Sequence, residues 1–171
     1  VLIEENDFFR DQWGGPTSDV AYAISSVLYV RNPNATIRRN RIRGGEYGVI
    51  LANSAAGQRF YSNLVLDNAE GISAGGGPDT WLIGNTLSGS RLSPNGTLGR
   101  AINKGANANT IARNNLLLSS DFGIDSTVAG NNSHNAFWGV GSNYRNSANG
   151  TSDVTANPLV DANYRPAATS P

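Results

Sequence analysis

Five charged residues in the middle of the chain are candidates for acid–base chemistry on a sugar: Glu70, Arg100, Lys104, Asp121 and Asp125. Glycosidases need two carboxylates roughly 5–10 Å apart. Polysaccharide lyases need a base beside a uronate carboxylate and a cation that neutralises that carboxylate. The three acids could act as the carboxylates or the base, and Arg100 and Lys104 as the cation. These residues are separated in sequence, so the elements that carry them decide whether they meet.

Those elements follow a repeat. One asparagine recurs every 22 to 34 residues, at Asn6, Asn40, Asn63, Asn85 and Asn114. A large apolar residue stands three positions before each asparagine: Ile3, Ile37, Phe60, Leu82 and Ile111. Another stands two positions after it: Phe8, Ile42, Val65, Leu87 and Leu116. A third column is a small residue followed by an apolar one: Ala23-Ile24, Gly48-Val49, Gly71-Ile72, Ala101-Ile102 and Gly123-Ile124. Self-similarity at this period indicates a solenoid.

The repeat predicts β-coils and not helical pairs. Glycine, asparagine and serine interrupt each apolar run after about four to six residues, which is too short for a helix. Coils of about 22 residues with three short strands are typical of a parallel β-helix. The asparagine column predicts a ladder of side-chain amides at an inward corner, bonded from coil to coil. The alternative is that each asparagine is only a turn residue that tolerates positive φ.

This pattern resembles the pectate-lyase-like superfamily over residues 1–132. The resemblance implies an all-β, single-stranded right-handed parallel β-helix of about six coils with a C-terminal capping segment. It also implies a secreted protein, extracellular or at the cell surface, that acts on polysaccharide. The run AINKGANAN at 101–109 is similar to the lysine-bearing coil of alginate-lyase and chondroitinase-B-like enzymes, whose lysine falls on Lys104. Arg100 stands where that family has an acid. No cofactor is evident, and Ca²⁺ is the metal that the resemblance allows, without a visible ligand cluster.

We expect one domain, 1–171, that lacks N-terminal coils or a cap. The expected units are 1–35 (coil 1, with an insertion at 11–18), 36–58, 59–80, 81–110 (with a loop at 88–99), 111–132, and 133–171 (last coil and cap). By resemblance the C-terminal segment crosses the end of the coils, with Leu159, Val160 and Tyr164 packed on it. An unprotected first coil predicts end-to-end self-association through the N-terminal edge.

Composition restricts the partners and the chemistry. The formal charge is zero, from 13 basic and 13 acidic residues without a basic block, which argues against nucleic acid and anionic membranes as partners. No apolar run is long enough for a membrane span. Cysteine is absent, so thiolate sites are excluded, and a histidine-based metal site or triad would depend on His134 alone. The arginines at 38, 39, 41 and 43 are expected to form a solvated face, with Arg39 paired to Glu5 and Arg41 to Asp7.

Two classes of function remain. The first is a polysaccharide-binding or polysaccharide-processing protein, lyase-like or glycosidase-like, acting on an extracellular glycan. The second is a non-catalytic structural or adhesive module, or the C-terminal fragment of a larger β-helix enzyme. Aromatic residues in a groove beside Glu70 and Arg100 would favour the first class, and a fully ion-paired face would favour the second.

Overall fold

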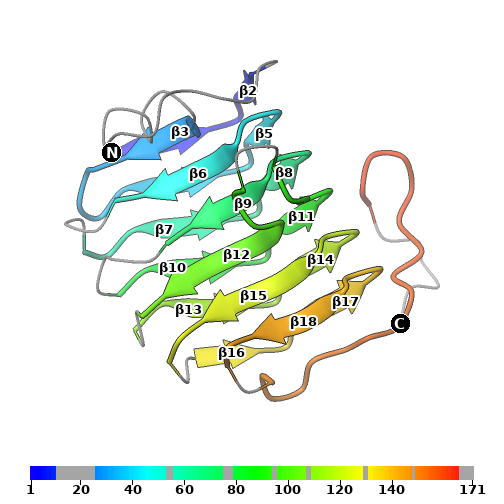
Figure 1. Ribbon diagram of the computed structural model, residues 1–171. Helices are drawn as coiled ribbons and strands as arrows, with labels where there is room; N and C mark the ends of the chain where they lie inside the picture. Colours follow the sequence, from blue (N-terminus) through cyan, green and yellow to red (C-terminus); the bar gives the residue numbers. More distant parts are fainter. Residues whose placement is uncertain are drawn as a thin grey trace.

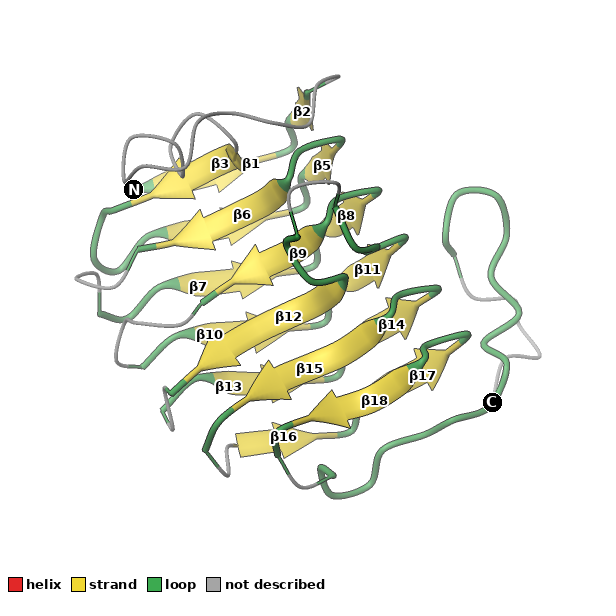
Figure 2. Cartoon of the chain, viewed as in Figure 1, coloured by secondary structure: helices red, strands yellow, loops and turns green. Residues whose placement is uncertain are grey.

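The computed structural model describes residues 1–10, 26–52, 56–74, 79–93, 96–106, 109–128, 131–147 and 149–165. Within these ranges all regular elements are β-strands, and they form three parallel sheets of six strands each. Each coil contributes one strand to each sheet, so successive coils stack as layers (Figures 1 and 2). The fold is therefore the predicted parallel β-helix. No helix in the described part of the chain is long and apolar enough to cross a membrane.

Each sheet contains its six strands in coil order. Sheet A consists of β1 (Leu2–Glu4), β4 (Thr36–Arg38), β7 (Arg59–Tyr61), β10 (Trp81–Ile83), β13 (Ile111–Arg113) and β16 (Asn131–Ser133). Sheet B consists of β2 (Asp7–Phe9), β5 (Arg41–Arg43), β8 (Leu64–Leu66), β11 (Thr86–Ser88), β14 (Leu116–Leu118) and β17 (Ala136–Trp138). Sheet C consists of β3 (Ser26–Val30), β6 (Tyr47–Leu51), β9 (Glu70–Ser73), β12 (Arg100–Gly105), β15 (Phe122–Ser126) and β18 (Ser142–Arg145). We number the coils 1 to 6 in the same order.

The core consists of one apolar column from each sheet. In sheet A, Ile37, Phe60 and Leu82 are paired in register and have no exposed surface. Sheet B adds the column of Ile42, Val65, Leu87, Leu117 and Phe137, and sheet C adds that of Val49, Ile72, Ile102 and Ile124. Full burial of one such side chain stabilises the fold by roughly 1.5–3 kcal/mol. The stacked columns therefore hold the coils together.

Coil 5 is displaced by one residue from the sequence alignment. Ala112, not Ile111, pairs with Leu82, and Leu117, not Leu116, pairs with Leu87. Ile111 is half-buried, whereas Ala112 is fully buried. The sequence placed the larger side chain inward, and a slip of one residue moves a whole strand's side chains to the opposite face. The assignments of Ile111 and Leu116 to the core were therefore wrong.

Coil 1 also differs from the alignment. Leu28 of β3 pairs with Val49, in the position that the alignment gave to Ile24. Ala23-Ile24 and the insertion at 11–18 lie outside the described residues, so those predictions stay untested. Leu28 follows Val27 and not a small residue, which is why the small-plus-apolar pattern did not find it.

A ladder of six asparagines runs through the corner between sheets A and B. Each backbone N–H donates to the Oδ1 of the next asparagine at 3.0–3.1 Å, in the order Asn6, Asn40, Asn63, Asn85, Asn115 and Asn135. Each Nδ2 from Asn6 to Asn115 bonds the same Oδ1. The ladder thus satisfies polar groups that the corner buries. The ladder position of coil 5 belongs to Asn115, so its assignment to Asn114 was wrong.

The residue before each ladder asparagine makes the bend. These residues have φ between 53° and 64°: Glu5, Arg39, Ser62, Gly84, Asn114 and His134. The left-handed region turns the chain between one strand and the next. Asparagine enters that region more readily than most residues, which explains Asn114 at this position. Asn114 therefore forms the corner while Asn115 forms the ladder.

The C-terminal segment begins a further turn and then leaves it. Thr151 and Val154 bridge to Ser133 and Ala136 of the last coil. Figure 1 shows the chain passing beneath β18 and then rising beside the sheets. Leu159 is 46% exposed, so its predicted packing on the end of the coils was wrong. Tyr164, five residues after Leu159, lies beside residues of coils 2 to 4. This part of the C-terminal segment therefore runs along the side of the stack and not across its end.

Candidate functional site

The outer face of sheet C carries one column of polar and aromatic side chains. Tyr47, Glu70, Arg100 and Phe122 are paired in register on coils 2 to 5. This register is the one that the small-plus-apolar pattern predicted, because these residues directly precede the small residues of that pattern. Glu70 and Arg100 therefore lie one rung apart.

Glu70 is buried and fully paired. Its Oε2 forms an ion pair with the Arg100 guanidinium, and its Oε1 accepts a hydrogen bond of 3.0 Å from Asn103 Nδ2. The side chain has no exposed surface. Burial raises the pKa of Glu70 above its ordinary value, although the positive charge of Arg100 acts to lower it. A carboxylate in this state is not accessible to a polymer substrate.

Asp125 completes the cluster on the next rung. Its Oδ2 accepts from Arg100 Nη1 at 3.0 Å and lies 3.5 Å from Arg145 Nη1. Its Oδ1 accepts a bond of 2.8 Å from Asn146 Nδ2. Two carboxylates and two guanidinium groups thus form a neutral network across coils 3 to 6. We call Glu70, Arg100, Asp125 and Arg145 the sheet C network.

Asp121 lies outside this network and binds the coil 4 loop. Its Oδ1 accepts from Arg91 Nη1 at 3.2 Å, and its Oδ2 accepts the backbone N–H of Leu92 at 2.8 Å. The Asp121 side chain therefore holds the beginning of the loop against coil 5. Its role in the structure is to fix chain geometry.

The other end of the same loop reaches coil 2. Thr97 Oγ1 donates to Glu46 Oε1 at 2.5 Å, and Ser93 Oγ lies 3.4 Å from the same oxygen. Inside the loop, the Ser93 hydroxyl accepts the Thr97 N–H at 3.0 Å. Nothing in the sequence indicated that the coil 4 loop would bind Glu46. Neither Glu46 nor Asp121 joins the sheet C network.

Lys104 points into the core. It has no exposed surface, and its Nζ donates to Asn132 Oδ1 at 2.9 Å. Burial lowers the pKa of Lys104 to about 8. The register between β12 and β15 shifts between Asn103 and Gly105. The structure therefore separates Lys104 from Arg100 and Asp125.

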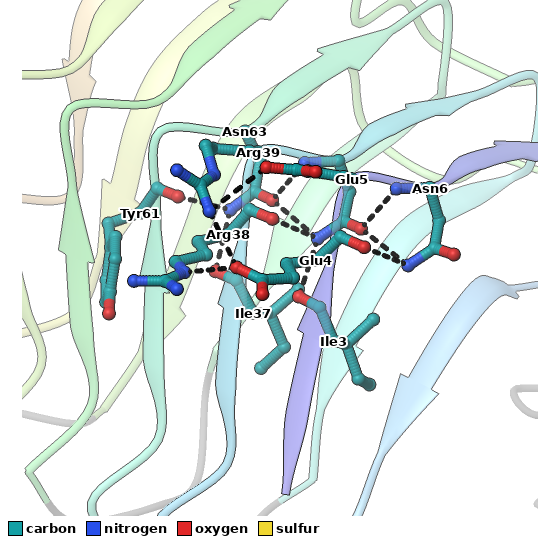
Figure 3. A network of polar contacts seen from close by, with 10 residues as sticks. Ile3, Glu4, Glu5, Asn6, Ile37, Arg38, Arg39, Tyr61 and Asn63 are labelled. Atoms are coloured by element: carbon teal, nitrogen blue, oxygen red, sulfur yellow. Dashed lines mark hydrogen bonds and ion pairs between the residues drawn. The ribbon is translucent and has the colours of Figure 1, made fainter.

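The arginines of coil 2 are partly paired with acids of coil 1 (Figure 3). Arg38 Nε lies 2.6 Å from Glu4 Oε2, and Arg39 Nη2 lies 2.8 Å from the same oxygen and 3.1 Å from Glu5 Oε1. Hydrogen bonds from Arg38 and Arg39 lower the pKa of Glu4. The Arg39–Glu5 pair was thus predicted correctly.

The second predicted pair of this face was wrong. Asp7 and Arg41 are opposite each other in the register, but Asp7 Oδ1 lies 3.9 Å from Arg43 Nε and forms its ion pair there. Arg41 makes no side-chain hydrogen bond or ion pair with the described residues, and it is exposed.

An open groove of about 450 Å³ lies along the corner between sheets A and B on coils 2 to 4. The corner residues Arg39, Ser62 and Gly84 line it together with Arg41, Leu64 and Thr86 at the start of the sheet B strands. Asn163 and Tyr164 of the C-terminal segment form its wall. No local sequence signal indicated this groove, because it requires the C-terminal segment to lie beside coils distant in sequence.

The described residues contain no group of three or more His, Cys, Asp or Glu side chains placed to hold a metal ion. His134, the single histidine of the sequence, occupies the corner of coil 6, with φ of 56° and its backbone N–H bonded to the Thr151 carbonyl.

Residues 5–164 match the model of the family described as periplasmic copper-binding protein (NosD). The chain belongs to the NosD family. No curated protein and no solved structure matches it. The match spans nearly the whole β-helix and the C-terminal segment that borders the groove. Membership of the NosD family agrees with the fold, and it leaves the resemblance to pectate lyases at the level of a shared parallel β-helix.

Proposed function

We propose that this NosD family chain is a non-catalytic β-helix module. The observation that supports the proposal is the pairing of all four carboxylate oxygens of Glu70 and Asp125, with Arg100, Asn103, Arg145 and Asn146. A general base must reach a substrate proton directly or through one water. Here the acids bond to neighbouring rungs, so the sheet C network acts as a clamp between coils.

The aromatic side chains beside the network do not alter this proposal. Tyr47 and Phe122 flank Glu70 and Arg100 in the column, and the Arg145 guanidinium lies 5.0 Å from the centre of the Phe122 ring. The Phe122 ring thus packs against Arg145 of the network, which favours a packed, ion-paired face. A fully ion-paired face was expected for a structural module, and the described geometry therefore favours a structural module over a catalyst.

The copper that the family description names does not fit this chain's donor set. Copper in proteins favours thiolate, thioether and imidazole ligands. The sequence contains no cysteine or methionine and one histidine. We therefore propose no copper chemistry for these residues. Thermal unfolding with and without equimolar Cu²⁺ tests this statement: the same midpoint is expected, and a saturable rise would contradict it.

Polysaccharide binding is the second candidate, and the outer face of sheet A favours it. Trp81 is 42% exposed, and the Arg59 guanidinium lies 5.3 Å from the centre of its ring. Tyr61 lies on the same face in coil 3, where it pairs with Ile83 of coil 4. Exposed aromatic rings beside arginine provide a stacking and hydrogen-bonding surface. Because the family description is periplasmic, we also propose that the chain works outside the cytoplasm, in place of the more specific extracellular location.

One assay separates these functions. The protein is incubated with uronate-containing and neutral polysaccharides, and both unsaturated products and new reducing ends are measured. We expect no turnover by the wild type. Turnover that Arg100→Ala removes and that Arg31→Ala, at an exposed arginine directly after β3, leaves unchanged would contradict the non-catalytic assignment. Binding without turnover would support the second candidate.

A further inference from the structure

The groove has a cationic end and a hollow end. Its floor is built from two columns, the corner residues Arg39, Ser62 and Gly84 and the strand-start residues Arg41, Leu64 and Thr86. The two arginines stand on coil 2, and the smaller side chains stand on coils 3 and 4. The side chains therefore become shorter along the groove, which leaves space beside the arginines.

Gly84 is central to that space. A Cβ added there would have only the Ser62 hydroxyl near it, at 4.0 Å. Its φ of 64° also strains most substitutions. The volume of about 450 Å³ lies within the range of roughly 300–1,000 Å³ typical of ligand pockets. The groove is thus large enough for a small organic ligand.

The charge of the groove is positive. Arg41 is exposed and uses none of its guanidinium donors on the described residues. Arg39 bonds Glu4 and Glu5, yet its side chain remains 52% exposed. None of the described lining residues is acidic. An anionic ligand would therefore find an unpaired cation without competing carboxylates inside the groove.

The remaining lining groups suit a hydroxylated ring more than a simple anion. Ser62 and Thr86 offer hydroxyls, Asn163 offers an amide, and Leu64 and Tyr164 offer apolar or aromatic surface. An arginine guanidinium matches a carboxylate in a planar, two-bond geometry. A carboxylated sugar combines all these features in one ligand.

We propose that this groove binds an acidic saccharide, with the carboxylate against Arg41 and the ring between Leu64 and Tyr164. The proposal rests on saccharide binding, the second candidate function, and it adds a ligand class and a site at the corner that is separate from the outer face of sheet A. The groove lies at the corner between sheets A and B, whereas the sheet C network lies on a different sheet. Binding here is therefore independent of the acids that the sequence suggested for catalysis.

Titration calorimetry with trigalacturonate and uncharged maltotriose tests the proposal. We expect the wild type to bind trigalacturonate and bind maltotriose at least tenfold more weakly. Arg41→Ala and Arg41→Gln should each weaken trigalacturonate binding at least tenfold, and Thr86→Trp should abolish it by filling the groove. Arg31→Ala, which removes an exposed arginine directly after β3 and outside both the groove and the outer face of sheet A, should change the Kd less than twofold.

Other results would overturn the assignment. The groove is not an acidic-sugar site if the wild type does not bind trigalacturonate. The same conclusion follows if the wild type and both Arg41 variants bind trigalacturonate equally well. If maltotriose or the neutral polysaccharides bind and trigalacturonate does not, saccharide binding survives and the groove assignment fails. If inorganic phosphate or sulfate displaces trigalacturonate at equal concentration, the site recognises any anion and the saccharide assignment is wrong. Equal circular dichroism spectra and unfolding midpoints verify that all variants are folded.

Discussion

Asp153 ends the asparagine ladder: its Oδ1 accepts the backbone N–H of Asn135 at 2.8 Å. Five asparagine side chains accept the same bond from the coil before, and Asp153 takes this role after the sixth. The other Asp153 oxygen accepts from Tyr144 Oη at 2.5 Å. A carboxylate thus closes a series of amides where the regular coils stop.

We predict that Asp153→Ala destabilises the protein by about 1–3 kcal/mol, because it leaves the Asn135 N–H and the Tyr144 hydroxyl without their acceptor. Asp153→Asn keeps an acceptor oxygen and should lose clearly less. Urea unfolding of the two variants measures the difference. Equal losses would mean that the negative charge, and not the acceptor position, supports this end of the ladder.

Substitution of the two adjacent asparagines of coil 5 should affect the free energy of unfolding very differently. Asn115→Leu removes the acceptor of the Asn85 N–H and the donor to the Leu82 carbonyl, so we expect a loss of about 3 kcal/mol or more. Asn114→Gly keeps the positive φ of 53° without strain and should stay within about 0.5 kcal/mol of the wild type. Chemical denaturation of both variants decides between the two registers. A larger loss in Asn114→Gly would restore the register that the sequence suggested.

Lys104 should make the stability depend on pH. Its pKa is about 8 in the fold and 10.5 as the ordinary value. Between these values the unfolded chain binds more protons than the folded protein, so the unfolding free energy contributed by this residue increases with pH. Lys104→Met should be more stable than the wild type at pH 7.5, and the gap should narrow by pH 9.5. A gap that stays constant over this range would show that the buried amine does not titrate there.

The periodic part of the fold could be predicted from the sequence because identical positions recur under identical constraints. Ile37, Phe60 and Leu82 each precede a ladder asparagine by three residues, and all three lie in one buried column. The same periodicity placed Glu70 and Arg100 on adjacent rungs. One residue of a repeat thus locates its equivalents in neighbouring coils.

Three other features could not be predicted, because the sequence of a single coil does not determine them: the register of coil 5, the position of Lys104 and the path of the C-terminal segment. Coil 5 allows two registers, because it contains two candidates for each position: Ile111 or Ala112, Asn114 or Asn115, and Leu116 or Leu117. The alignment selected the register that places the larger side chain, Ile111, in the core. Lys104 was placed with Arg100 because the register shift in β12 has no signal in the sequence. The position of Tyr164 beside coils 2 to 4 depends on the path of the C-terminal segment around the stack.

Arg100 pairs with Glu70 of coil 3 and Asp125 of coil 5, and we propose that its role is to clamp these coils and not to take part in catalysis. Removing one partner of a buried ion pair leaves an uncompensated charge, which costs about 3–5 kcal/mol. A double-mutant cycle measures this most directly, with unfolding free energies for Glu70→Met, Arg100→Met and the double variant. We predict a loss of about 3 kcal/mol for each single variant and a loss well below their sum for the double variant. Single variants as stable as the wild type or more stable, with additive effects, would contradict the clamp.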